Sequence, residues 1–104
     1  MAKRVNAKLT LYTVTTDWQG RETEEAHGPY DVWDERHTVY GFNGLGKGGK
    51  AVISVARGIV FVWDNLPVSI HDRIDIGGKS FSVVGIDIYN DGRGNFHHME
   101  LAYA

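Results

Sequence analysis

Apolar and polar residues alternate along three short segments that fill the last third of the chain, from Asp72 to Tyr103. A side-chain period of two is typical of strands, so this region predicts a β-meander, which a helix cannot explain. Gly77-Gly78 separates the first two segments and can adopt the positive φ angles of a tight hairpin turn. The apolar positions predicted to face one core are Ile74, Ile76, Phe81, Val83, Ile86, Ile88, Met99 and Leu101.

The alternation slips by one position at Val83-Val84, where two apolar residues are adjacent. A slip moves every later side chain to the other face unless a bulge or bend absorbs it, and Gly85 lies at that point. A second turn is predicted over Asn90–Asn95, before the final strand.

The earlier part of the chain contains further strands and two polar or glycine-rich connections. Val5–Leu11 alternates and predicts an opening strand, and Tyr30–Phe42 predicts another. Thr16–Pro29 is polar and is predicted to be a long loop. Gly41–Gly49 holds five glycines in nine positions and predicts no regular structure.

The most apolar segment, Ile59–Trp63, is apolar on both faces of its predicted strand. Val60 and Val62 face one side, and Phe61 and Trp63 face the other. Such a strand is central in a domain or lies against a neighbouring subunit, so these four residues are candidates for the core or a subunit interface.

Together the patterns predict an all-β fold, a small barrel or sandwich of about six strands with long loops, as one domain over residues 1–104. The hydrophobic content of 42% suits a single core. With no cysteine the chain has neither disulfides nor thiolate metal sites. No run approaches the ~20 apolar residues of a membrane span, so no membrane partner is expected.

Charge is distributed unevenly although the net charge is only −2. The stretch Asp17–Glu35 contains seven acidic residues and one arginine, which gives −6. Glu22, Glu24 and Glu25 form its densest cluster. The sequence therefore lacks the overall basic character of a nucleic-acid-binding protein.

Motifs for catalysis, metals or cofactors are not convincing. Gly44–Lys50 resembles a phosphate-binding loop, but Ala51 stands where Ser or Thr belongs and a β-rich run follows instead of a helix. The His97-His98 pair is predicted to point to opposite faces of a strand, His97 toward the core edge and His98 outward. We expect no enzyme activity, no catalytic or metal-ligating residues, and no cofactor.

Three segments of the chain resemble the head-closure (stopper) or minor capsid proteins of long-tailed bacteriophages. The resemblance lies in Arg57–Trp63, in Asp72–Val84 with its Gly-Lys turn, and in the final His98–Leu101. The opening Leu9–Tyr12 fits as well. Counted with the residues that lie between Arg57 and Leu101, the resemblance spans about half of the chain.

The resemblance implies a structural role at the head-to-tail connector of the virion, for a protein made in the host cytoplasm. Such proteins form a ring with themselves, six- or twelvefold by family. The ring docks under the portal and adaptor rings, closes the DNA channel, and presents a surface for the tail terminator or tail tube. Packaged DNA passes through without sequence-specific binding.

Two segments have no counterpart in the resemblance, and we expect one of them to line the channel. The acidic one, with Glu22, Glu24 and Glu25, is preferred because a negative surface repels DNA. Lys47 and Lys50 in the glycine-rich segment are the competing candidates, and docking of both segments outside the channel is a third possibility. Other roles left open are another virion ring component, such as a tail terminator, and a small OB- or SH3-like nucleic-acid- or protein-binding module.

Overall fold

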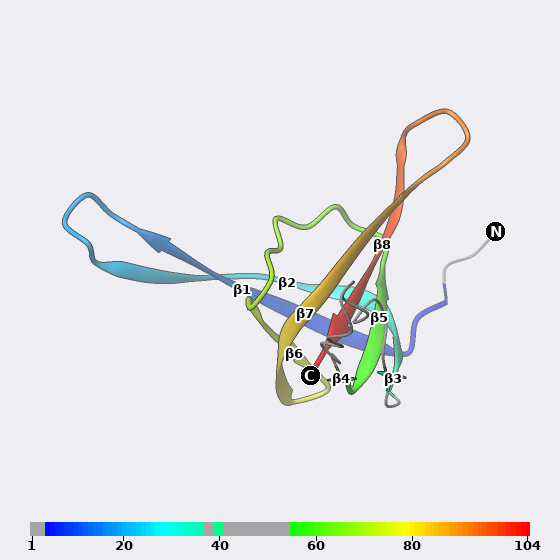
Figure 1. Ribbon diagram of the computed structural model, residues 1–104, viewed down its shortest axis with the longest axis horizontal. Coiled ribbons are helices and arrows are strands. Elements are labelled where there is room, and N and C mark those ends of the chain that lie inside the picture. The colour runs from blue at the N-terminus through cyan, green and yellow to red at the C-terminus, as the bar shows by residue number, and fades with distance from the viewer. Residues whose placement is uncertain (1–3, 37–38, 41–54) are drawn as a thin grey trace, which may run out of the picture.

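Six antiparallel strands close into a barrel in a computed structural model that describes residues 4–36, 39–40 and 55–104 (Figure 1). Their order around the wall is β1-β2-β5-β8-β7-β6, and a separate two-stranded pair is formed by β3 and β4. The described residues contain no helix, so none could cross a membrane. The prediction of an all-β fold is confirmed. The strands are β1 Ala7–Thr16, β2 Glu22–Glu35, β3 Val39–Tyr40, β4 Val55–Ala56, β5 Gly58–Val62, β6 Arg73–Ile76, β7 Lys79–Asn90 and β8 Phe96–Tyr103.

The core fills the barrel with side chains from all six wall strands and from the connection between β5 and β6. Alternate residues of each strand point inward, as the period of two requires. Leu66 closes the core from that connection. The buried cluster consists of Leu9, Leu11, Val32, Val60, Val62, Leu66, Ile74, Ile76, Val83, Met99, Leu101 and Tyr103.

The predicted meander is present as β6, β7 and β8. Gly77 and Gly78 form the two-residue turn with φ angles of 60° and 84°. The ladder between β7 and β8 shifts register between Val83 and Gly85, which confirms the bulge. Five of the eight predicted core residues are buried, and Phe81 and Ile86 pack partly buried against the core. Ile88 was placed wrongly, because it is 58% exposed.

Strand β5 lies in the barrel wall between β2 and β8. Val60 and Val62 are fully buried in the core. Phe61 and Trp63 lie in the opposite phase and are half-buried on the outer surface.

A hydrogen-bonded group joins the end of β2 to the end of β8. The ring of Tyr103 is buried, and its hydroxyl donates to Oδ1 of Asp34 at 2.5 Å. Nε of Arg36 lies 3.4 Å from the same hydroxyl and donates to it. A Cβ on Gly58 would lie 2.5 Å from this hydroxyl and 2.7 Å from the carbonyl oxygen of Glu35, so the site requires a glycine.

The prediction of a loop over Thr16–Pro29 is wrong. Most of that segment belongs to β2, which pairs with β1 from Thr16↔Glu22 to Ala7↔Val32. The strand continues because the two backbones satisfy each other's hydrogen bonds, and it needs no apolar face to do so. The predicted Gly41–Gly49 segment lies outside the described residues.

Candidate functional site: two hairpin arms

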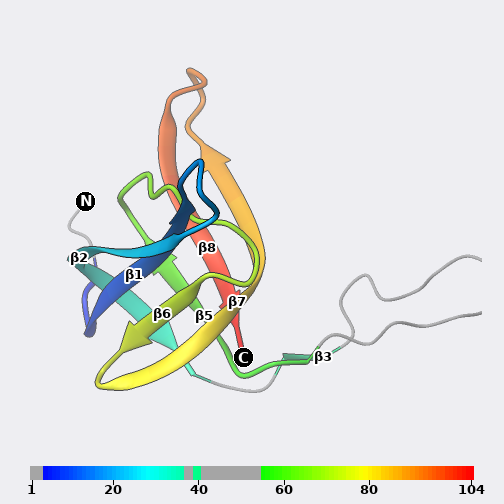
Figure 2. The same ribbon diagram turned by 90° about the vertical axis from the view of Figure 1, so that its left-hand side faces the viewer.

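Two β-hairpins extend beyond the wall of the barrel in different directions (Figure 1). The β1–β2 arm comprises residues 13–25, past the point where β1 pairs with β6. The β7–β8 arm comprises residues 86–98: β7 pairs with β6 only as far as Ser82, and β8 pairs with β5 only from Met99 onward. After a quarter turn of the molecule, the β1–β2 arm points toward the viewer while the β7–β8 arm rises above the barrel (Figure 2).

Both arms end in the same kind of turn, over Asp17–Arg21 and Asp91–Asn95. In each, the first and fifth residues flank a loop of three residues. In each, Oδ1 of the aspartate accepts hydrogen bonds of 2.8–3.0 Å from the backbone N–H groups two and four residues later. The aspartate C=O accepts from the N–H of a glycine three residues later, at 3.0 Å. Those glycines, Gly20 and Gly94, have φ angles of 82° and 83°. This is a three-residue hairpin loop with a glycine bulge, and the same hydrogen bonds define the conformation of both tips.

Large exposed apolar side chains are concentrated on the arms. Trp18, at the tip of the β1–β2 arm, is 90% exposed, and Val14 on the same arm is 53% exposed. Ile88 and Tyr89 on the β7–β8 arm are exposed as well. A tryptophan at a hairpin tip with almost no contact to its own domain is typical of a residue that anchors in a partner.

The three clustered glutamates lie on β2 in the β1–β2 arm, and all are exposed. Because side chains alternate along a strand, Glu22 and Glu24 share one face and Glu25 lies on the other. Glu24 is not a free charge, since Oε1 accepts from Nη2 of Arg73 at 3.1 Å. The repulsive cluster inferred from the sequence is therefore divided between two faces and partly neutralised.

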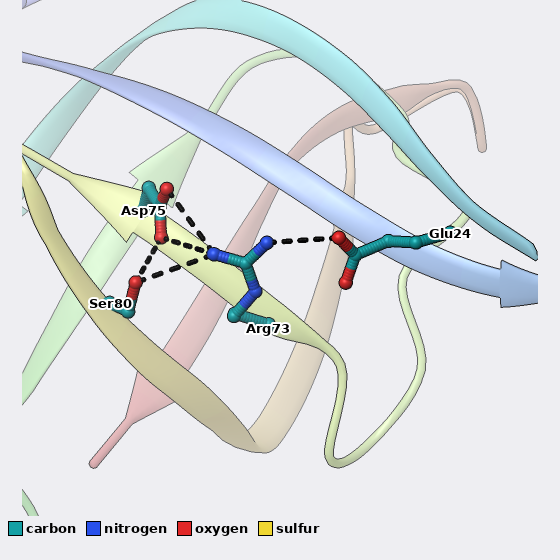
Figure 3. A network of polar contacts seen from close by, with 4 residues as sticks. All are labelled: Glu24, Arg73, Asp75 and Ser80. Atoms are coloured by element: carbon teal, nitrogen blue, oxygen red, sulfur yellow. Dashed lines mark hydrogen bonds and ion pairs between the residues drawn. The ribbon is translucent and has the colours of Figure 1, made fainter.

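Arg73 fixes the base of the β1–β2 arm to the β6–β7 hairpin (Figure 3). Its Nη1 donates to Oδ1 of Asp75 at 3.2 Å, and Asp75 also accepts from the hydroxyl of Ser80 at 2.5 Å. The guanidinium carbon lies 3.8 Å from the ring centroid of Tyr12. The planar guanidinium thus contacts side chains of β1, β2, β6 and β7.

The histidine pair near the base of the β7–β8 arm was assigned wrongly from the sequence. The β7–β8 ladder shifts register beside Tyr89, which leaves His97 as an extra residue in β8. A bulge turns neighbouring side chains toward the same side, and the two Nδ1 atoms lie 2.8 Å apart. His98 is the more buried of the two, stacks on Tyr89 and contacts Glu100 at 3.2 Å. The charge of Glu100, with some desolvation, raises the pKa of Tyr89 above its usual value.

The remaining candidates do not join the arms. Lys47 and Lys50 lie outside the described residues, and Val60, Phe61, Val62 and Trp63 lie in the barrel wall. Within residues 4–36, 39–40 and 55–104, no three His, Asp or Glu side chains come together as a metal site would require. The sequence analysis missed the β1–β2 arm and its tip. The recurring pattern of Asp followed three residues later by Gly could have revealed both turns.

Comparison with known proteins gives no family for this chain: no family model, curated protein or solved structure matches it.

Proposed function

We propose that this protein is a ring-forming head-to-tail connector component of a long-tailed bacteriophage, a stopper that closes the portal channel and provides a docking surface for the tail. The observation that carries the proposal is a small closed barrel from which two hairpins with hydrogen-bonded tips project. Their exposed anchor residues, Trp18 and Ile88 among them, have no partner surface within the described domain. A barrel with such projections fits a component that is clamped between larger rings.

The segments that carry the resemblance to stopper proteins are neighbours in space. Arg57–Trp63 contains β5, Asp72–Val84 contains β6 and the start of β7, and His98–Leu101 belongs to β8. These strands are consecutive around the wall, in the order β5-β8-β7-β6. The resemblance therefore lies on four consecutive strands of the six-stranded wall rather than on scattered positions.

The β1–β2 arm serves in this proposal as a docking element, with its tip seated in an adjoining ring. An exposed indole is suited to a protein pocket and not to sliding DNA, which favours a charged, hydrated wall. Glu24 is held by Arg73, so the arm presents less free negative charge toward a channel than its sequence indicates.

A nucleic-acid-binding module is disfavoured by the ion pairs that four of the basic side chains in the described part of the chain form. Lys8, Arg21, Arg36 and Arg73 each form an ion pair with a carboxylate of the same domain. Cations already paired in this way release few counterions from DNA. We expect no binding of single- or double-stranded DNA at low salt, and strong binding there would favour the module instead.

The test combines the purified protein with the portal and adaptor rings of the phage that encodes it, followed by negative-stain imaging. We expect an additional ring below the adaptor. Trp18→Ala should abolish or weaken tail joining while DNA stays in the head, and the triple change of Glu22, Glu24 and Glu25 to Gln should have little effect on either. If the triple variant loses packaged DNA while tails join normally, the acidic cluster faces the channel. If no ring forms with wild-type protein, the connector proposal is wrong.

A further inference from the structure

The two arms each have one protected strand edge and one bare edge. In the β1–β2 arm, the outer edge of β2 carries Glu22 and Glu24 and continues into Pro29, which has no N–H group. In the β7–β8 arm, the edge of β8 is interrupted by the bulge at His97. Charges, proline and bulges are the features by which proteins prevent an open strand edge from pairing.

The other two edges contain no proline and no bulge, and they carry a single charge between them. Residues 13–16 of β1 are Thr-Val-Thr-Thr, uncharged and β-branched, and residues 86–90 of β7 are Ile-Asp-Ile-Tyr-Asn, with one charge. Both strands flank β6, which is only four residues long. Beyond its ends, no described residue forms a ladder with either edge.

The backbone groups of these edges point outward at identifiable residues. Asp17 and Asp91 direct their N–H groups to the opposite strand of their own hairpin. The N–H groups of successive residues in a strand point alternately to its two sides. The N–H groups that point away from the hairpin's other strand are therefore those of Val14 and Thr16 in β1 and of Ile86 and Ile88 in β7. Val14 and Ile88 also have exposed side chains in the middle of their edges.

We infer that the β1 edge, residues 13–16, pairs with the β7 edge, residues 86–90, of a second copy of this chain. Each edge supplies unpaired N–H and C=O groups, which an extended strand of the partner satisfies. The edges are of similar length, and each carries a central aliphatic residue that the contact would cover.

We infer a second copy as the partner because each molecule carries both the β1 edge and the β7 edge. The two edges lie on arms that point in different directions (Figures 1 and 2). A contact between two different patches is heterologous, and repeated head to tail it generates a ring when the rotation closes. An isologous dimer would need a single self-complementary edge. Closure of this contact into a ring rests on the proposed function. The edge pairing itself is inferred from the open strand edges of the two arms.

Single-cysteine variants test the contact directly, because the natural chain has no cysteine. We would mix Val14→Cys protein with Ile88→Cys protein, add a short bismaleimide, and compare the yield of covalent dimer with that of each variant alone. Glu22→Cys, an exposed position on the protected edge of the same arm, replaces Val14→Cys in the control. We expect several-fold more dimer from the Val14–Ile88 mixture than from any other combination. Equal yields, or dimer from Val14→Cys alone, would overturn the inference.

A second measurement separates the edge contact from the connector proposal. Val14→Pro removes one outward N–H and leaves the hairpin's own ladder intact, and Val14→Lys places a charge on the edge should the proline variant unfold. By sedimentation velocity we expect either variant to remain monomeric where wild type associates, with an unchanged unfolding midpoint. Association of folded Val14→Lys protein like wild type would refute the edge contact alone. A wild type that stays monomeric with and without the portal complex would refute both.

Discussion

Replacing Tyr103 by Phe removes a single hydroxyl from the end of the barrel and leaves the buried ring in place. The hydroxyl donates to Asp34 at 2.5 Å and accepts from Arg36 at 3.4 Å. The Asp34 side chain is only 10% exposed, and it would keep the ion pair with Arg36 at 3.3 Å as its charged partner. Loss of a hydrogen bond to a largely buried carboxylate costs about 1–3 kcal/mol. At this domain size, each kcal/mol lowers the melting temperature by roughly 4–8 °C.

The same hydroxyl makes the effect depend on pH. Burial and, next, the hydrogen bond to Asp34 raise the pKa of Tyr103 to about 12, against the opposing influence of Arg36. In the unfolded chain a tyrosine ionises near pH ~10. Between these values the unfolded state releases a proton that the folded state keeps, so the contribution of Tyr103 to stability is complete below pH ~10 and is lost as the pH rises toward 12.

Urea unfolding of wild type and Tyr103→Phe at about pH 8, and again at steps between pH ~10 and ~12, measures both effects. We expect the gap between the two proteins to narrow as the pH rises. Tyr30→Phe is the matched control, because Tyr30 also packs against the core but forms no hydrogen bond through its hydroxyl to any described residue. An unchanged midpoint for Tyr103→Phe at neutral pH, or a gap that stays constant up to pH 12, would refute the role assigned to this hydroxyl.

Two further stability predictions compare matched pairs of residues. Gly58→Ala should destabilise by about 1–3 kcal/mol or more, because its Cβ would overlap the Glu35 backbone and the Tyr103 ring, whereas Gly92→Ala meets no atom within 4 Å and should be neutral. Met99→Ala should cost roughly 2–5 kcal/mol as a buried truncation, whereas Ile88→Ala should stay within about 0.5 kcal/mol of wild type. Thermal unfolding measures the stability of all four variants. Equal losses of stability for Gly58→Ala and Gly92→Ala, or for Met99→Ala and Ile88→Ala, would contradict the burial described above.

The meander could be predicted from the sequence because each of its features has a local cause. Gly77-Gly78 accepts the positive φ angles of a two-residue turn, and Gly85 follows the residue that the ladder leaves out. Strand register depends on such turns and on the apolar phase, and both were readable from the sequence. The β-barrel prediction rested on these features.

The β1–β2 arm could not be predicted from apolar periodicity, because its outer part buries no face. Residues 13–16 and 22–25 are polar or exposed, and the ladder between them depends on backbone hydrogen bonds and on the Asp17 turn. Apolar periodicity identifies strands that bury one face, and it cannot identify strands that bury neither face. The turn itself had a readable signal, the spacing of Asp17 and Gly20.

Contacts between distant parts of the chain were not predictable. Tyr103 and Asp34 are 69 residues apart, and Arg73 and Glu24 are 49 apart. No local pattern relates such positions before the barrel closes. The bulge at His97 is of the same kind, since simple alternation places the two imidazoles on opposite faces and only the ladder with β7 brings them together.

The wrong placement of Ile88 carries information about assembly. The apolar alternation of β7 continues from Ile86 to Ile88, although Ile86 packs against the core and Ile88 is 58% exposed. Apolar alternation is typical of a strand with one covered face, and the described residues leave most of the Ile88 side chain exposed. Burying an isoleucine contributes about 1.5–3 kcal/mol, and contact with a second copy of the chain would supply that burial for Ile88. Ile88→Ala should therefore leave the folded monomer unchanged and weaken association of the copies by sedimentation. A variant that is neutral in both measurements would show that nothing covers Ile88.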